Sequence, residues 1–438
     1  MSTSTRHAFA IITVLFFMWG FITVLVDALI PRLRDVFELS YFQAGLVQFA
    51  FFTAYAMVSI PSGYLISRIG YQKGAVVGLS VMALGCLLFY PAAAFRIFEW
   101  FLLALFVLAS GMTVLQVAAN PYVAALGDPH RAASRLNLAQ AFNSLGTTLA
   151  PLVSAAFILS SQVLDAEAIA ALGGDAKEAY FAAEAVAVQQ PFAILAAVLI
   201  LVAGVFAWVR LPRILETTTD RSGSYRAAWS HRSLRLGAIG IFVYVGAEVT
   251  IGSYLVNYFL HLDIRALVLR SEGMATIARF LAGNGVSELG PAQLAGTFVF
   301  FYWGGAMVGR FIGSWLQTWI HPARLLAVFA SVNVALLGVN LISGGWLAVW
   351  SVLAIGLFNS ILFPTIFTLA IQHLGPHAAQ GSGILCTAIV GGAVVPPLYG
   401  ALADATGLQT AFLLPLLCYL FIAYYGIGGY HDRIQPES

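Results

Sequence analysis

The chain has 438 residues, of which 60% are hydrophobic and 9% are charged, and its formal net charge is +2. A soluble domain carries roughly 25% charged residues, so this composition excludes a water-soluble fold of the same length. Apolar segments of about 20 residues, enough to cross the hydrocarbon core of a bilayer, recur along the sequence. We therefore predict an all-α polytopic membrane protein with the lipid bilayer as a partner.

The sequence lacks the patterns that would indicate other classes of protein. No basic run with interleaved aromatic residues occurs, so we expect no nucleic-acid partner. Cys86, Cys386 and Cys418 all lie in apolar segments and show neither disulfide nor metal-ligand spacing. No nucleophile–base set, metal cluster or phosphate-binding glycine loop is visible. We predict that the chain is not an enzyme and holds no metal or cofactor.

The apolar segments predict twelve transmembrane helices. In chain order they cover residues 8–30, 42–66, 74–95, 98–126, 136–160, 188–211, 234–260, 293–317, 322–343, 345–373, 379–403 and 408–430. The first run continues to Ile30 without a small-residue cleavage pattern, so we interpret it as an uncleaved span rather than a signal peptide. We expect the sharpest breaks at Pro31, in a loop over residues 161–187, and in a basic segment from Arg210 to Arg235.

The two halves of the sequence echo one another, as in many transporters built from repeats. Spans four and five are punctuated by Gly111, Pro121, Gly127 and Pro151. Spans ten and eleven carry the same residue types in the same order, at Gly356, Pro364, Gly375 and Pro396. We predict two pseudo-symmetric six-helix bundles, at residues 1–211 and 234–438, joined by a cytoplasmic linker at residues 212–233.

The distribution of lysine and arginine predicts the orientation of the chain, because cytoplasmic loops carry an excess of both. With the amino terminus inside, 14 of the 21 such residues fall on the cytoplasmic side. The seven on the other side are Arg32, Arg34, Arg96, Lys177, Arg265, Arg270 and Arg279. We expect both termini in the cytoplasm and the chain in a bacterial inner (plasma) membrane.

Six plus six spans with a glycine-rich basic turn after span two resemble the major facilitator superfamily. The residues that fit the cytoplasmic motif of that superfamily are Gly63, Leu65, Arg68, Gly70 and Lys73. Ser67 stands where an aspartate is usual, so the resemblance does not extend to the charge-pair latch between helices at this position.

Longer stretches look like one group within the superfamily, the fucose–galactose–glucose:proton symporter family. These stretches are Phe16–Pro31, Gln43–Tyr55, Leu115–Gly127, Arg135–Pro151, Tyr244–Tyr258 and Gly356–Ile371. The chain is more similar to the glucose/galactose transporters of the family than to its fucose permeases, because Gln116 stands where the fucose permeases carry an acid. Val26 is a departure, since the family commonly has asparagine there. The resemblance implies two bundles around a central sugar site, alternately open to either side, with uptake coupled to a cation.

Two acids within predicted spans are candidates for cation coupling. An acid inside the membrane is costly and usually faces a cavity or a partner. Asp27 lies in the outer part of span one, and the family resemblance implies that it carries the proton; an interfacial acid is the alternative. Glu248 lies near the middle of span seven, where substrate and coupling-ion sites gather. We predict that it contacts sugar and shares in coupling; the alternative is a packing acid bonded to Tyr244.

Amides in apolar helices are the candidates for sugar binding, because hydrocarbon offers them no partner. Amides also donate and accept hydrogen bonds, which suits sugar hydroxyls. Gln116, Gln140 and Asn143 are the candidates in the first half, and Gln140 and Asn143 are three residues apart on one helix face. Asn359, five residues before Pro364, is the candidate in the second half. The alternative is interhelical amide packing.

The predicted function is uptake of a small-molecule sugar, glucose or galactose, by proton symport through alternating access. Sodium-coupled symport is an alternative, as is transport of a related sugar such as fucose or an N-acetylhexosamine. A multidrug exporter is a weaker alternative, because it would need a more apolar cavity than these amides provide. We expect a monomer.

Overall fold

The structure is a computed structural model that describes residues 3–36, 41–95, 97–157, 173–209, 211–212, 224–282 and 289–431. Side chains are described for these residues except 3–4, 25–36, 41–48, 151–157, 181–188 and 282. The described part of the chain contains helices and turns and no strand, as the all-α prediction requires.

The chain forms two compact units. Unit 1 consists of Met1–Ala132, Phe142–Ala228 and Leu374–Thr387, and unit 2 consists of Ala133–Ala141, Trp229–His373 and Ala388–Ser438. Each unit therefore includes one short segment from the other half of the sequence.

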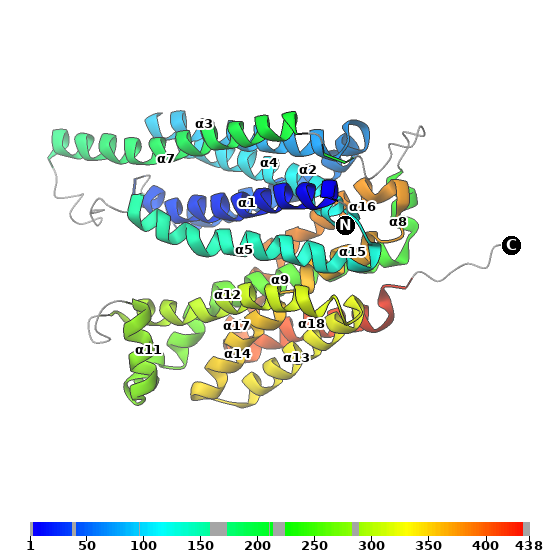
Figure 1. The fold of residues 1–438 in the computed structure, drawn as a ribbon. Coiled ribbons are helices and arrows are strands. Elements are labelled where there is room, and N and C mark those ends of the chain that lie inside the picture. Colours follow the sequence, from blue (N-terminus) through cyan, green and yellow to red (C-terminus); the bar gives the residue numbers. More distant parts are fainter. Residues whose placement is uncertain are drawn as a thin grey trace. The chain divides into compact units, whose positions relative to one another are not determined.

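The long helices of unit 1 come from the first half of the chain (Figure 1). They are α1 (Thr3–Val36), α2 (Tyr41–Ile69), α3 (Tyr71–Phe95), α4 (Phe98–Ala125), most of α5 (Ala132–Phe157) and α7 (Gly174–Trp208). The short helices α8 (Tyr225–Ser230) and α16 (Ala378–Thr387) complete the unit, with the 3-10 turns η1 (Pro129–Arg131) and η2 (Gly375–His377). α3 packs against both α4 and α7, and α16 packs against α2 and α4.

Unit 2 is built in the same way from the second half. Its long helices are α9 (Arg232–His261), α12 (Pro291–Leu316), α13 (Pro322–Ile342), α14 (Gly345–Asn359) with α15 (Leu362–Ile371), α17 (Gly391–Thr406) and α18 (Leu413–Tyr424). Two short helices, α10 (Ile264–Leu269) and α11 (Glu272–Ala282), connect α9 to α12. The remaining turns are η3 (Ala388–Val390), η4 (Thr410–Phe412) and the π-helical η5 (Tyr425–Gly429).

The twelve predicted spans all coincide with helices, the last three with a long helix plus a shorter helix or turn. Among the described residues, ten segments are long and apolar enough to cross a membrane, and α5 and α12 are not among them. The most enclosed of the ten are α4 and the α14–α15 pair, in each of which 78% of the apolar stretch is buried inside the protein. Spans four and ten are thus largely enclosed by protein, where a polar side chain is kept from lipid.

Two expectations about breaks were wrong. α1 continues through Pro31 to Val36, because a proline removes one backbone donor and bends a helix without having to end it. α7 begins at Gly174, so the second part of the predicted 161–187 loop is helical; its alanines and glutamates favour helix although its charges lower hydropathy. The linker region also contains a helix, α8.

The repeated glycines mark equivalent turns in the two halves. Gly127 has φ +95° and Gly375 has φ +49°, a region that residues with a side chain adopt only at a cost. Each glycine lies at a turn of 3-10 helix that leads into the next span, η1 before α5 and η2 before α16. The sequence repeat therefore reflects the same reversal of the chain used twice.

Candidate functional site

A connected group of polar side chains lies at the centre of unit 2. The Tyr244 hydroxyl donates to Glu248 Oε1 at 2.7 Å, and the two residues are one turn apart on α9. Asn359 Nδ2 donates to the Tyr302 hydroxyl at 2.9 Å, and Asn333 Nδ2 donates to Asn359 Oδ1 at 2.9 Å. All of these side chains are buried except Glu248, which is half-buried. Four helices, α9, α12, α13 and α14, thus meet through one hydrogen-bonded network.

The backbone around Asn359 is open because the helix is interrupted there. α14 ends at Asn359, and α15 begins at Leu362. Pro364 has no N–H, so the carbonyl of Ser360 four residues earlier has no helical partner. Arg310 Nε donates to that carbonyl at 3.3 Å, and the Tyr244 hydroxyl lies 3.2 Å from the Asn359 carbonyl. The interruption therefore supplies acceptors that hold a tyrosine and an arginine in place.

The Glu248 carboxylate has one oxygen held and one available. Tyr244 fixes Oε1, and among the described residues no side chain donates a hydrogen bond to Oε2. The Arg310 guanidinium is close enough for its charge to interact with that of Glu248. A carboxylate held through one oxygen can accept hydrogen bonds from ligand hydroxyls through the other.

In unit 1, Gln116 is held by a tyrosine and keeps a free acceptor. Its Nε2 donates to the Tyr55 hydroxyl of α2 at 2.8 Å. Gln116 Oε1 is buried, and no donor within the described part of the chain reaches it. Gln116 is 6% exposed and Tyr55 is 2% exposed, so this acceptor is enclosed by protein.

Asn143 lies where α1 and α5 cross closely. Its Nδ2 donates to the Phe16 carbonyl at 2.9 Å. A side chain at Gly20 would collide with the Asn143 carbonyl, and one at Gly146 would collide with the Phe17 carbonyl. The two glycines therefore let α5 approach α1 closely enough for Asn143 to reach the Phe16 carbonyl.

Gln140 precedes Asn143 by three residues on α5. It lies in the segment Ala133–Ala141, which belongs to unit 2. Its carbonyl lies 3.5 Å from Arg310, and its buried Nε2 has no acceptor among the described residues. In the same segment, the Ser134 and Ser314 hydroxyls each donate to the other's carbonyl, at 2.7 and 2.9 Å.

Asp27 lies within α1, and its side chain is outside the described residues. Of the remaining predicted site residues, the structure brings Glu248 and Asn359 into one network through Tyr244. Sequence reasoning missed Tyr302 and Asn333 in that network. Asn333 could have been found by the same argument as the others, since it is an amide in an apolar span; Tyr302 could not, because tyrosines are common in this chain.

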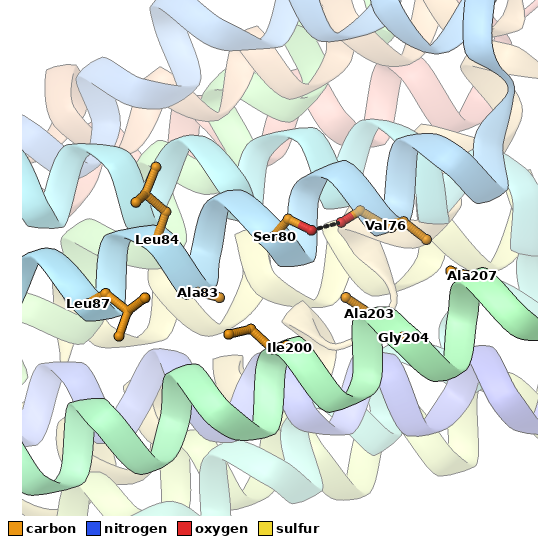
Figure 2. A pocket seen from close by; sticks show the side chains of 9 residues that line it. All are labelled: Val76, Ser80, Ala83, Leu84, Leu87, Ile200, Ala203, Gly204 and Ala207. Atoms are coloured by element: carbon orange, nitrogen blue, oxygen red, sulfur yellow. Dashed lines mark hydrogen bonds between the residues drawn. The ribbon is translucent and has the colours of Figure 1, made fainter.

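An apolar groove between α3 and α7 is a poor candidate for a sugar site. Figure 2 shows its lining, which includes Leu84, Leu87, Ile200 and Gly204. Its volume is about 390 Å³, but its one hydroxyl, that of Ser80, already donates to the Val76 carbonyl at 2.9 Å. A groove without an available polar group offers nothing to sugar hydroxyls.

Comparisons with known proteins agree with this architecture. Residues 8–389 match the model of the Major Facilitator Superfamily. The chain is 51% identical to a glucose/galactose transporter of Brucella abortus, over 98% of this chain and 96% of the relative. It is 34% identical to the L-fucose-proton symporter of Escherichia coli strain K12, over 94% and 91% of the two chains.

A solved structure also matches. The crystal structure of the transporter FucP in the outward conformation superposes with a TM-score of 0.86 and 32% sequence identity, covering 97% of this chain and 99% of that one. The higher identity to the glucose/galactose transporter than to the fucose symporter confirms the order of similarity predicted from Gln116. This chain is therefore a multi-span membrane protein of the Major Facilitator Superfamily, and within it belongs to the fucose–galactose–glucose:proton symporter family.

Proposed function

We propose that this chain takes up glucose and galactose by symport with protons, through alternating access of two six-helix bundles at residues 1–211 and 234–438. The observation that carries the proposal is the Glu248 network, in which a half-buried carboxylate has one oxygen fixed by Tyr244 and the other available. Its relatives support the substrate class, since one is named a glucose/galactose transporter and another an L-fucose-proton symporter.

The polar groups without internal partners are the proposed sugar ligands. Glu248 Oε2 and Gln116 Oε1 would accept from sugar hydroxyls, Gln140 Nε2 would donate, and Asn143 would accept through the amide oxygen that its bond to Phe16 leaves over. Asn359 has a different proposed role. Its side-chain amide is bonded at both ends, to Asn333 and Tyr302, and its backbone carbonyl accepts from Tyr244, so it positions the two tyrosines.

Asp27 is the proposed carrier of the coupling proton. Glu248 is proposed to share in the coupling. A carboxylate in a site that opens to either side of the membrane can take up a proton on one side and release it on the other. Symport with sodium is the alternative coupling, with Asp27 as an ion ligand. Both termini and the linker at residues 212–233 are proposed to lie on the cytoplasmic side of a bacterial inner membrane, as the distribution of basic residues suggests.

The test is uptake of labelled hexose by the full chain in proteoliposomes, with an imposed pH gradient and with or without sodium. We expect concentrative uptake of glucose and galactose that needs the pH gradient and not sodium, with fucose and N-acetylglucosamine competing weakly. Asp27→Asn should abolish concentrative uptake while exchange of labelled for unlabelled sugar continues. A requirement for sodium would replace the proton in this scheme, and the absence of any hexose flux would overturn it.

A further inference from the structure

Two polar residues of unit 1 lie one turn beyond the Tyr55–Gln116 pair. They are Ser59 on α2, four residues after Tyr55, and Asn120 on α4, four residues after Gln116. α2 and α4 run in the same direction, because the helix between them, α3, is joined to each by a short reversal. Residues four apart share a helix face. Ser59 and Asn120 therefore lie at one level of the α2–α4 interface, next to the level of Gln116.

The polar atoms at this second level have no partners. Asn120 and Ser59 are 0% exposed. Within the described part of the chain, neither amide atom of Asn120 has a hydrogen-bond partner, and neither does Ser59 Oγ. A buried polar group left without a hydrogen-bond partner destabilises the fold, and an apolar residue would avoid this cost. The chain thus holds unpaired polar groups beside its proposed sugar ligand, at an energetic expense that packing does not explain.

Helix α16 covers this level. The Ser382 hydroxyl donates to the Val117 carbonyl of α4 at 2.9 Å. Gly383 passes so close to α2 that a side-chain carbon there would lie 2.8 Å from the Ser59 carbonyl. At the next residue of α2, the Tyr225 hydroxyl of α8 donates to the Ile60 carbonyl. Burial raises the pKa of Tyr225 to about 12, so its hydroxyl keeps the proton that it donates.

We propose that Ser59 and Asn120 form a second hexose-binding step, which the sugar occupies after it leaves Gln116 and when α16 no longer covers α2 and α4. The Asn120 amide can donate and accept, and the Ser59 hydroxyl can do both, which is what a hexose with several hydroxyls needs. This step lies between Gln116 and the turn at Gly127, on the side proposed above to be cytoplasmic. The inference rests on the proposed function, because it concerns the path of the same sugar.

The test compares the two directions of transport by the full chain in right-side-out and inside-out membrane vesicles, with no pH gradient. For Asn120→Ala and Ser59→Ala we expect the KM measured with sugar on the cytoplasmic face to rise about 5- to 10-fold, the equivalent of one lost hydrogen bond. The KM measured with sugar on the other face should stay within about twofold of that of the unmodified protein. The Vmax from that face should fall by the same factor as the cytoplasmic-face KM rises. Gln116→Ala should raise both KM values, because the sugar meets Gln116 from either side.

Thr113→Val is the matched control. Thr113 is a buried residue of α4, and its hydroxyl donates to the Ala109 carbonyl of the same helix; neither KM should change. If Asn120→Ala does not fold, Ser59→Ala decides. Equal changes in both KM values, or no change in either, would overturn the inference while the unmodified protein still transports hexose. No flux through the unmodified protein would overturn the proposed function and this inference with it.

Discussion

Glu248 is held by a tyrosine of its own helix, and this contact decides what the carboxylate can do. The Tyr244 hydroxyl lies 2.7 Å from Oε1 and also 3.2 Å from the Asn359 carbonyl. One hydroxyl proton cannot serve both acceptors fully, so Tyr244 can turn from the carboxylate to the carbonyl. When the carboxylate gains a proton or a ligand, Tyr244 can therefore give up its hydrogen bond to Oε1 and donate to the Asn359 carbonyl instead.

Tyr244→Phe should weaken sugar binding without loss of the fold. The change removes a hydrogen bond to a charged group, which is worth about 1.5–3 kcal/mol, and keeps the ring in its buried place. We expect the KM for galactose to rise by at least about tenfold. Tyr254→Phe on the same helix is the control, since its hydroxyl makes only a 3.5 Å contact with the Pro396 carbonyl. Similar KM values for the two variants would show that Tyr244 does not orient Glu248.

At the residue scale, sequence reasoning found polar residues but not their partners. Gln116, Glu248 and Asn359 stand out because each is polar within an apolar span. Their partners are separated by long stretches of sequence, 61 residues from Tyr55 to Gln116 and 57 residues from Tyr302 to Asn359. Spacing along a helix predicts which residues share a face, but it does not say which helix packs on that face.

At the scale of helices, the crossing of α1 and α5 depends on two glycines. Side chains at Gly20 and Gly146 would each collide with backbone of the opposite helix. Because backbone atoms cannot turn aside as a side chain can, a larger residue must push the helices apart. The same displacement would break the 2.9 Å bond between Asn143 and the Phe16 carbonyl.

Gly146→Leu should therefore destabilise the protein and impair sugar binding together. Overpacking costs about 1–3 kcal/mol or more, so we expect a lower melting temperature in detergent and a weaker Kd for hexose. Gly204→Leu on α7 is the matched control, because no atom lies within 4 Å of the added carbon and the side chain would enter the open groove of Figure 2. Equal melting temperatures for the Gly146→Leu and Gly204→Leu proteins would contradict the close crossing of α1 and α5.

Hydropathy was a good guide to where helices exist and a poor guide to where they are interrupted. The predicted spans at residues 345–373 and 379–403 appear continuous in composition. The structure breaks the first between α14 and α15, and the second at the 3-10 turn between α16 and α17. Hydropathy does not report these breaks, because apolar residues continue through both of them. The first break is marked instead by Pro364, whose missing N–H leaves the Ser360 carbonyl to accept from Arg310.

At the scale of the whole molecule, a bound sugar should stabilise the fold. A ligand that binds only the folded protein adds about 2.7 kcal/mol when its concentration is 100 times its Kd. We expect galactose to raise the melting temperature of the purified protein by a few degrees, and Glu248→Gln to abolish the increase. Mannitol at the same concentration controls for the effect of a polyol on the solvent. An equal increase with mannitol would mean that the stabilisation is not binding.

The segment Leu374–Thr387 has a consequence for how the protein is made. It completes unit 1, yet it follows all the other residues of that unit by more than a hundred positions. A ribosome synthesises a chain from its amino terminus, so the face of α2 and α4 that α16 covers must wait in the membrane while most of the second half is produced. Ser59 and Asn120 are on that face. The nascent protein therefore leaves these polar groups uncovered until α16 is made, and a chain truncated before residue 374 lacks the helix that covers them.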